Sequence, residues 1–271
     1  MQSKLDTSVI ATHFQSFTMS QATSPKPILG GKAAFVTGGS RGIGAAIVRR
    51  LAQDGAAVAF SYASNDAAAR DLAASIEAAG GRAIPLRVDS ADADALRSAI
   101  DQAAHAFGRL DILVNNAGVL KLGAVDQVSL EDFDLTLKVN VRAVFVAIQA
   151  ALRHMGEGGR IINIGSTNAE RMPFAGGGVY AMSKSALTGL VQGFARDLGP
   201  RGITINNVQP GPVDTDMNPA DGPMASTMHS FMALSRHGRG DEIAGMVAYL
   251  AGPEAGFVTG ASLNIDGGFA A

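Results

Sequence analysis

Cysteine is missing from this chain of 271 residues. Its absence excludes a disulfide framework, a thiolate metal site and a cysteine nucleophile, and a cytoplasmic location is the simplest interpretation. Long apolar runs are missing too, since no stretch approaches the roughly 18 residues that a spanning helix requires. The first 30 residues lack the basic start and apolar run of a secretory signal. We therefore expect neither membrane insertion nor secretion.

Charge is also scarce. Charged residues make up 17% of the chain, the formal net charge is −2 and the pI is about 6.2. This balance gives no cationic field for a nucleic-acid partner. The histidines show no paired ligand spacing, so we expect no metal site. By contrast, 47% of residues are hydrophobic and 33 are glycine, which fits one sizeable α/β domain with a buried core.

The amino-terminal part differs in composition from the rest. Residues 1–29 are rich in Ser, Thr, Gln and Pro, and the sequence turns apolar at Ala33. We expect a disordered tail over 1–29 and the fold over 30–271. Met19 is a candidate for the true start of the protein, because the folded pattern begins soon after it.

From Ala33 onward, short β-branched or apolar runs alternate with longer alanine-rich stretches. This rhythm predicts βαβ units, and strands too apolar to alternate need helices on both faces of a parallel sheet. With right-handed crossovers the result is a doubly wound, seven-stranded Rossmann-type fold. The expected strands are 33–37, 57–62, 82–88, 111–115, 160–164, 204–208 and 262–265.

A glycine-rich turn follows the first expected strand. Gly38, Gly42 and Gly44 have the spacing Gly-x3-Gly-x-Gly and open a helix expected over 44–54. Backbone amides and the helix dipole at such a turn bind phosphate, so a nucleotide pyrophosphate is expected here. Glycines also simply permit tight turns, and the position after the first strand is what favours the nucleotide.

Tyr180 and Lys184 are one helical turn apart, which places the phenol and the ammonium on one helix face. An ammonium about 4 Å from the phenol, at an effective dielectric near 20, contributes about 4 kcal/mol, or about three pKa units. We therefore expect Lys184 to lower the pKa of Tyr180 toward neutrality. Such a phenol suits the proton transfer that accompanies hydride reduction of a ketone. Ser166 follows an apolar strand, and its hydroxyl is expected at the carboxyl end of the sheet.

Together these motifs resemble the short-chain dehydrogenase/reductase family. Its signatures Thr-Gly-x3-Gly-x-Gly, Asn-Asn-Ala-Gly and Tyr-x3-Lys occur here in the family's order, beginning at Thr37, Asn115 and Tyr180. The resemblance runs from about Gly31 to the C-terminus and is closest to the 3-oxoacyl-carrier-protein reductase-like branch. The stretch 211–268 is also similar to bacterial cyclic-di-GMP-binding biofilm-dispersal proteins.

The resemblance implies residue roles. The catalytic residues are Asn140, which supports a water, Ser166, which bonds the substrate oxygen, Tyr180 as acid and base, and Lys184, which also binds the ribose hydroxyls. The expected cofactor contacts, beyond Tyr180 and Lys184, are Gly38, Ser40, Arg41, Gly42, Ile43, Gly44, Tyr62, Ser64, Asp89, Asn116, Ala117, Gly118, Pro210, Gly211, Val213 and Thr215.

The choice of cofactor depends on the end of the second strand, where an acidic side chain bonds the ribose 2′-hydroxyl of NAD. Tyr62 occupies that position, and Arg41 with nearby hydroxyl groups suits a 2′-phosphate. NADP(H) is therefore expected. Asp66 is the rival acidic residue, and we interpret it as the cap of the next helix.

One spacing departs from the family's pattern. The family commonly places thirteen positions between the serine and the tyrosine, whereas Ser166 and Tyr180 differ by fourteen. The run of glycines at 176–178 offers slack for the extra residue. Thr167 remains the one-step alternative hydroxyl.

The region after Pro210 and Gly211 is expected to cover the substrate. Residues 214–238 are rich in Met and interrupted by prolines, which predicts a mobile lid over an apolar carbonyl substrate. The first functional interpretation is an NADPH-dependent carbonyl reductase or alcohol dehydrogenase. The second is a cyclic-dinucleotide-binding regulator on the same fold. The family resemblance also implies a homotetramer, or a dimer.

Overall fold

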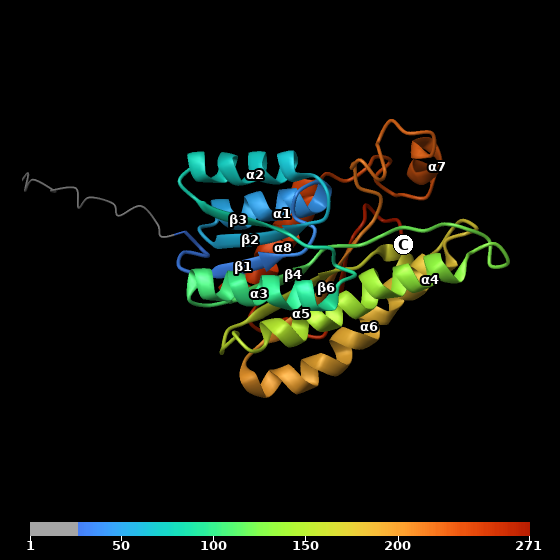
Figure 1. Cartoon of the computed structure of the whole chain (residues 1–271). Helices are drawn as coiled ribbons and strands as arrows, with labels where there is room; N and C mark the ends of the chain where they lie inside the picture. Colours follow the sequence, from blue (N-terminus) through green and yellow to red (C-terminus); the bar gives the residue numbers. More distant parts are fainter. Residues whose placement is uncertain (1–26) are drawn as a thin grey trace, which may run out of the picture.

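The computed structural model describes residues 27–271. Seven parallel strands form one sheet in the order β3-β2-β1-β4-β5-β6-β7 (Figure 1). The predicted doubly wound sheet is thereby confirmed. The strands are β1 (Ala33–Val36), β2 (Ala57–Tyr62), β3 (Arg82–Arg87), β4 (Ile112–Asn115), β5 (Arg160–Ile164), β6 (Thr204–Pro210) and β7 (Ser262–Ile265).

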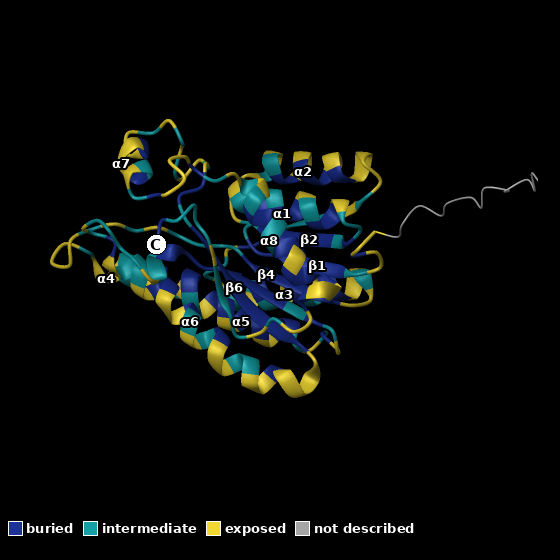
Figure 2. Cartoon of the chain, turned by 180° about the vertical axis from the view of Figure 1, so that it is seen from behind, coloured by how far each residue is buried: buried dark blue, intermediate teal, exposed yellow. Residues whose placement is uncertain are grey.

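Helices cover both faces of the sheet. One face packs against α1 (Gly42–Gln53), α2 (Asp66–Ala78) and α8 (Gly240–Ala251). The opposite face packs against α3 (Ala93–Phe107), α5 (Ala143–Ala151) and α6 (Gly178–Leu198). Figure 2 shows the strands buried between these layers, while the outer helix faces are exposed. Burial on both faces explains why the inner strands are largely apolar, whereas the edge strands β3 and β7 are only partly buried.

The shorter elements lie at the carboxyl edge of the sheet, where the strands end. They are α4 (Leu130–Leu137), a π-helical turn (Lys138–Arg142), α7 (Ala225–Ser230) and a 3₁₀ turn (Thr167–Ala169). Two further 3₁₀ turns connect helices to strands: Gly199–Arg201 lies between α6 and β6, and Pro253–Ala255 lies between α8 and β7. Figure 1 shows α7 standing clear of the sheet, beyond the helical layer that contains α1 and α2.

Two expected boundaries need correction. Leu29, expected in the disordered tail, is only 1% exposed, and its amide donates to the Asp54 carbonyl at 2.8 Å. Asp66 is not a cap, because α2 begins at that residue and Asn65 caps the helix by accepting from the Ala68 amide at 3.0 Å. The proposed start at Met19 lies outside the described residues.

A row of hydrogen-bonded side chains, three asparagine amides and one serine hydroxyl, crosses four strands of the sheet. The Nδ2 of Asn115 donates to Asn163 Oδ1 at 2.8 Å, and Asn163 Nδ2 donates to Asn207 Oδ1 at 3.0 Å. Asn207 Nδ2 then donates to Ser262 Oγ at 3.1 Å. These residues are partners in the strand register, so the amides stack across β4, β5, β6 and β7. We refer to this row as the asparagine ladder.

Among residues 27–271, no helix combines the length and the apolar character needed to cross a bilayer.

Candidate active site at the carboxyl edge of the sheet

The glycine-rich turn joins β1 to α1 and forms a narrow cradle. Gly38 and Gly42 have positive φ angles of 64° and 52°, which favour glycine. A Cβ at Gly44 would lie 2.2 Å from the Gly38 carbonyl oxygen, so no side chain fits there. The amides of the first turn of α1 have no partner within the helix and point toward an incoming anion. The cradle therefore fits a dinucleotide pyrophosphate.

The Asn-Asn-Ala-Gly segment supports this turn. Asn116 Nδ2 donates to the carbonyl oxygens of Thr37 and Gly38 at 3.0 and 2.9 Å. Thr37 Oγ1 accepts from the amides of Asn116 and Ala117 at 2.9 Å each. The side-chain amide of Asn116 thus stabilises the glycine-rich turn. A ligand at this segment would meet mainly its backbone.

The end of β2 carries Tyr62, and Arg41 lies across the glycine-rich turn. Arg41 Nη1 is 3.9 Å from Asp216 Oδ2, and both side chains are exposed. Burial raises the pKa of Tyr62, and the neighbouring Asp66 raises it further. Asp66 therefore lies beside Tyr62 rather than away from the cofactor region, while Arg41 stays accessible to a phosphate.

Other predicted cofactor residues have varied surroundings. Thr215 lies against the glycine-rich turn, because a Cβ at Gly42 would be 3.4 Å from its Cγ2. Gly211 packs on Asp266, where a Cβ would lie 2.8 Å from the Asp266 Cα atom. Asp89 accepts from the Ala91 amide at 2.9 Å, a local turn contact. The structure thus brings Thr215 to the cradle and leaves Asp89 exposed in its own turn.

Lys184 is buried on α6, below the end of β5. Its Nζ donates to the Ile164 carbonyl at 2.9 Å and lies 5.8 Å from the centre of the Tyr180 ring. The side chain is inaccessible to bulk water, and burial lowers its pKa from 10.5 to about 8. This cation is therefore poorly solvated, which favours its pairing with a hydroxyl or a developing phenolate.

Ser166 follows the end of β5, where its Oγ accepts from the Asn168 amide at 3.1 Å and donates to Asn168 Oδ1 at 3.3 Å. Burial raises the pKa of Tyr180, while a side-chain hydrogen bond with Ser166 acts to lower it. The rise is opposite to the predicted lowering by Lys184. The reason is that the phenol is enclosed, and loss of water disfavours its anion more than the neighbouring groups favour it.

Thr167, the alternative hydroxyl, points elsewhere and donates to the Pro210 carbonyl at 3.2 Å. In the loop between Ser166 and Tyr180, Gly176 has a φ of +86°, and its carbonyl accepts from the Gly123 amide at 2.9 Å. Ser166, rather than Thr167, is therefore the hydroxyl that acts on the pKa of Tyr180.

Asn140 lies in the π-helical turn between α4 and α5. Its Oδ1 accepts from the Val119 amide at 2.9 Å, and its Nδ2 lies 3.0 Å from both the Val119 carbonyl and Ser183 Oγ. A Cβ at Gly118 would be 3.5 Å from both Asn140 Oδ1 and Lys184 Nζ. The wide turn explains how a buried asparagine reaches this position in a helical segment, which sequence periodicity did not indicate.

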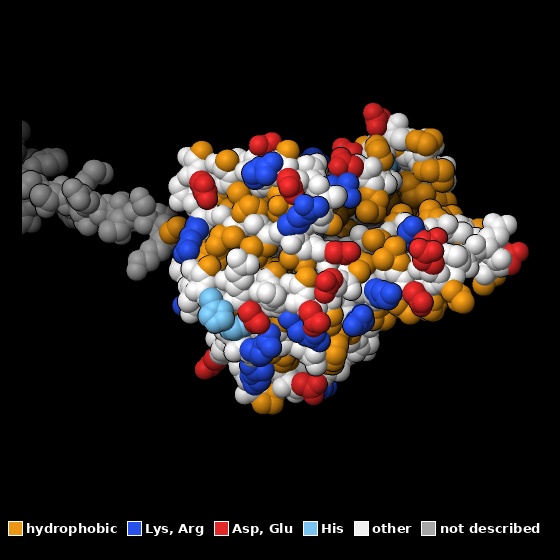
Figure 3. Space-filling view, in the orientation of Figure 1, with side chains coloured by type: hydrophobic (Ala, Val, Ile, Leu, Met, Phe, Trp, Pro, Cys, Tyr) orange, Lys and Arg blue, Asp and Glu red, His pale blue; other side chains and the backbone are white. Residues whose placement is uncertain are grey.

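Residues 214–238 close over the same edge. Met228 and Met232 are buried in a small apolar cluster with Phe269, against which Phe174 and Phe231 pack. Met217 and Met224 are exposed. Figure 3 shows hydrophobic side chains gathered on the side of the molecule that carries α7 and α4. The surroundings of the site are therefore apolar.

Two contacts in this region were missed by sequence reasoning. His229 Nε2 lies 2.7 Å from His237 Nδ1, which ties α7 to the segment leading into α8. Arg171 Nη1 donates to the Phe269 carbonyl at 2.6 Å and so fixes the C-terminal segment beside the apolar cluster. Neither pairing leaves a periodic pattern in the sequence, because both depend on how the loops fold back onto the domain.

This constellation on a doubly wound sheet is characteristic of one family. The family described as enoyl-(acyl carrier protein) reductase matches residues 38–270. The chain belongs to the short-chain dehydrogenase/reductase family. The family expected from the three sequence motifs is confirmed.

Three similar proteins illustrate the relationship. The cyclic-di-GMP-binding biofilm dispersal mediator protein of Escherichia coli K12 is 54% identical over 241 residues, which cover 89% of this chain and 98% of the relative. A Serratia marcescens short-chain dehydrogenase/reductase is 63% identical, with a TM-score of 0.89 over 90% of this chain and all of that one. A Burkholderia cenocepacia short chain dehydrogenase, solved in complex with NADP, is 57% identical with the same TM-score and covers 90% of this chain and 100% of its own.

Proposed function

We propose that this chain is an NADP(H)-dependent oxidoreductase that reversibly reduces a ketone or 3-oxoacyl carbonyl to the secondary alcohol. The observation that supports it most strongly is the position of the Tyr180 ring, whose centre lies 5.8 Å from the Nζ of buried Lys184, while that Nζ donates to the Ile164 carbonyl at the end of the strand that precedes Ser166. These groups stand at the edge where parallel α/β sheets bind ligands. NADP(H) is supported by accessible Arg41, by the absence of an acidic residue at Tyr62, and by the NADP bound to the Burkholderia relative.

In the reduction direction, the bound nicotinamide supplies the hydride that reaches the carbonyl carbon. Ser166 holds the carbonyl oxygen by a hydrogen bond, and Tyr180 delivers its phenolic proton to that oxygen as negative charge develops. Lys184 then stabilises the phenolate through its charge. Asn140 holds the backbone of Val119, and a Cβ at the preceding residue, Gly118, would lie 3.5 Å from Lys184 Nζ, so Asn140 helps to keep the segment beside the lysine in place.

The alcohol-oxidation direction uses the same groups with the proton moving back to Tyr180. The rise in the pKa of Tyr180 caused by burial favours the protonated phenol, which is the form needed for reduction. The reaction is therefore proposed as reversible, with Tyr180 as the acid in reduction and as the base in oxidation. The apolar cluster around Met228 and Phe269 indicates an apolar substrate, with residues 214–238 as the lid.

The test is NADPH consumption over a panel of aliphatic, aromatic and 3-oxoacyl carbonyls. We expect turnover with at least one apolar carbonyl, and loss of most of that turnover in Ser166→Ala but not in Thr167→Val. Absence of turnover across the panel, with NADPH still bound, contradicts the proposal. Equal loss in both variants contradicts the assignment of Ser166. Comparison of KM for NADPH and NADH tests the cofactor.

A second function is favoured by one observation, the 54% identity to the cyclic-di-GMP-binding protein of Escherichia coli. We propose that this chain also binds a cyclic dinucleotide, in a regulatory role beside catalysis. Titration with cyclic-di-GMP tests it. We further propose a cytoplasmic homotetramer, or a dimer, without a nucleic-acid partner, and light scattering at several concentrations tests the assembly.

A further inference from the structure

A cavity lies far from Tyr180, at the amino edge of the sheet, where the strands begin. Its volume is about 920 Å³, and the first residues of β1, β2 and β3 line it together with the ends of α1, α2 and α3. Drug-sized and nucleotide-sized ligands occupy cavities of roughly 300–1,000 Å³. We call this space the amino-edge cavity. The active site described above makes no use of it.

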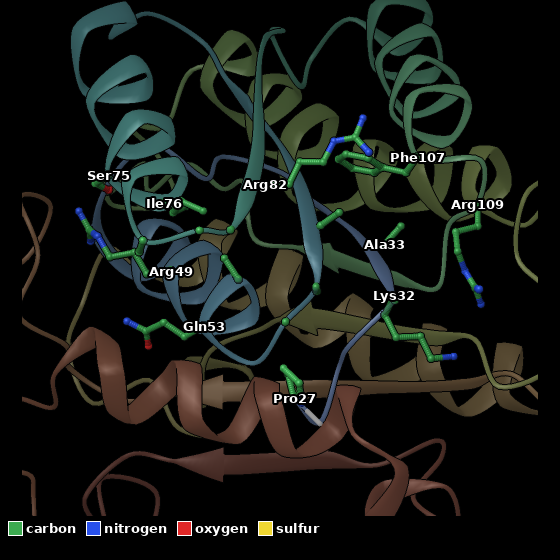
Figure 4. Close-up of a pocket in the computed structure, with 18 residues that line it drawn as sticks. Pro27, Lys32, Ala33, Arg49, Gln53, Ser75, Ile76, Arg82, Phe107 and Arg109 are labelled. Atoms are coloured by element: carbon green, nitrogen blue, oxygen red, sulfur yellow. The ribbon is translucent and has the colours of Figure 1, made fainter. Parts of the chain in front are cut away.

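Its lining is cationic. Lys32, Arg49, Arg82 and Arg109 all line the cavity, and no Asp or Glu side chain of residues 27–271 does (Figure 4). Behind the lining, Asp111 pairs with Lys32 at 3.2 Å and with Arg109 at 2.6 Å. One carboxylate thus faces two cations, while Arg49 and Arg82 add charge on the other side. The cavity carries excess positive charge in a protein whose net charge is −2.

Arg82 is held in a fixed orientation. Its guanidinium carbon lies 4.7 Å from the centre of the Phe107 ring, and Nη2 donates to the Ala106 carbonyl at 2.9 Å. Figure 4 shows the guanidinium lying beside the ring at the rim of the cavity. A planar, weakly hydrated guanidinium fixed in this way stacks on an aromatic base and still has donors for phosphate oxygens.

The helix ends limit what binds here. The carboxyl ends of α1, α2 and α3 meet at the cavity, and their partial negative charge offsets part of the lysine and arginine charge. A ligand with a single phosphate therefore gains little binding free energy. A ligand with two separated phosphates reaches the cations on both sides of the cavity. If the ligand also carries a planar base, that base stacks on the Arg82 guanidinium.

We propose that the amino-edge cavity is a binding site for a purine dinucleotide with two phosphate charges, distinct from the cofactor site. This rests on the second proposed function, cyclic-dinucleotide binding, and assigns that ligand a place. Because the cavity and the glycine-rich turn lie at opposite edges of the sheet, the dinucleotide and NADPH bind at the same time.

The experiment is calorimetric titration of the full chain with cyclic-di-GMP, alone and with saturating NADPH. We expect equal affinity in both titrations, an affinity that falls as salt rises, and a loss of about tenfold or more in the double variant Arg49→Gln/Arg82→Gln. GMP, with one phosphate, should bind much more weakly. Arg97→Gln, an exposed arginine of α3 outside the cavity, is the matched control.

Three results overturn the proposal: displacement of cyclic-di-GMP by NADPH, unchanged affinity in the double variant, or no binding of cyclic-di-GMP. The NADPH affinity and melting temperature of the double variant show that its fold is intact. Absence of cyclic-di-GMP binding overturns the second proposed function together with this site, whereas displacement by NADPH or unchanged affinity in the double variant overturns the site alone.

Discussion

The two edges of the sheet differ in the groups that they offer to a negatively charged ligand. At the carboxyl edge, the helices present their amino ends, and backbone amides in the glycine-rich turn face the ligand with Arg41 as an accessory. At the amino edge the helices present their carboxyl ends, and Lys32, Arg49, Arg82 and Arg109 gather there. One sheet thus gives two anion environments, one made by the backbone and one by side chains. The first is set by the fold, whereas the second depends on individual residues.

The variant with the largest expected effect tests whether catalysis takes place only at the carboxyl edge. Tyr180→Phe removes the proton donor, and we expect kcat to fall about 100- to 10,000-fold. The affinity for NADPH, measured by fluorescence titration, should change little, because the ring is kept. Arg49→Gln/Arg82→Gln at the other edge should keep wild-type kcat. Substantial turnover by Tyr180→Phe would remove this residue from the mechanism.

The next prediction concerns buried Lys184 and pH. Its pKa is about 8 in the folded protein against an ordinary 10.5, so the unfolded chain binds more protons between those values. Stability from this group therefore rises as pH rises through this window and is absent below it. At about 1.4 kcal/mol per pKa unit, the gain is about 3 kcal/mol.

The measurement is urea unfolding of wild type and Lys184→Met at pH 7.5 and pH 10. We expect the wild type to gain stability relative to the variant by up to this amount on going to pH 10. Groups common to both proteins cancel in the comparison. A constant difference between the two pH values would contradict the burial of a charged lysine.

A smaller effect is expected for Arg41. Its replacement by Ala removes the side-chain cation for a 2′-phosphate, and we expect KM for NADPH to rise about 10- to 100-fold. KM for NADH should be nearly unchanged, because NADH lacks that phosphate. Asp216→Asn, which frees Arg41 from its weak partner, should lower KM for NADPH slightly. An equal change for both cofactors would refute the assigned contact.

The smallest effect concerns the lid. Burial lowers the pKa of His237, neighbouring His229 lowers it further, and Asp214 opposes them. When residues 225–238 unfold, His237 takes up a proton more readily than in the folded structure, so the folded segment loses stability as pH falls below the ordinary value of 6.5. Hydrogen exchange of amides 225–238, corrected for intrinsic rates, should quicken at pH 5.5. His237→Gln should show less of this change.

The sequence allowed prediction of the seven strands, because buried parallel strands are continuously apolar and each ends at a turn signal. It also located Tyr180 and Lys184, since the helical period places them on one face. The rise in the pKa of Tyr180 was not predicted, because burial depends on packing by distant segments. The π-helical turn at Asn140 and the contact of His229 with His237 also have no local pattern.

The asparagine ladder has a consequence for assembly of the sheet. Its amides run head to tail, so that each donates to the next strand, and Asn163 and Asn207 also accept from the strand before. A slip of one residue between any two of these strands turns an amide to the opposite face and leaves its neighbours without partners. Each unpaired buried group costs about 1–3 kcal/mol. Misaligned sheets are thereby rejected during folding, and the correct alignment is selected before a ligand is present.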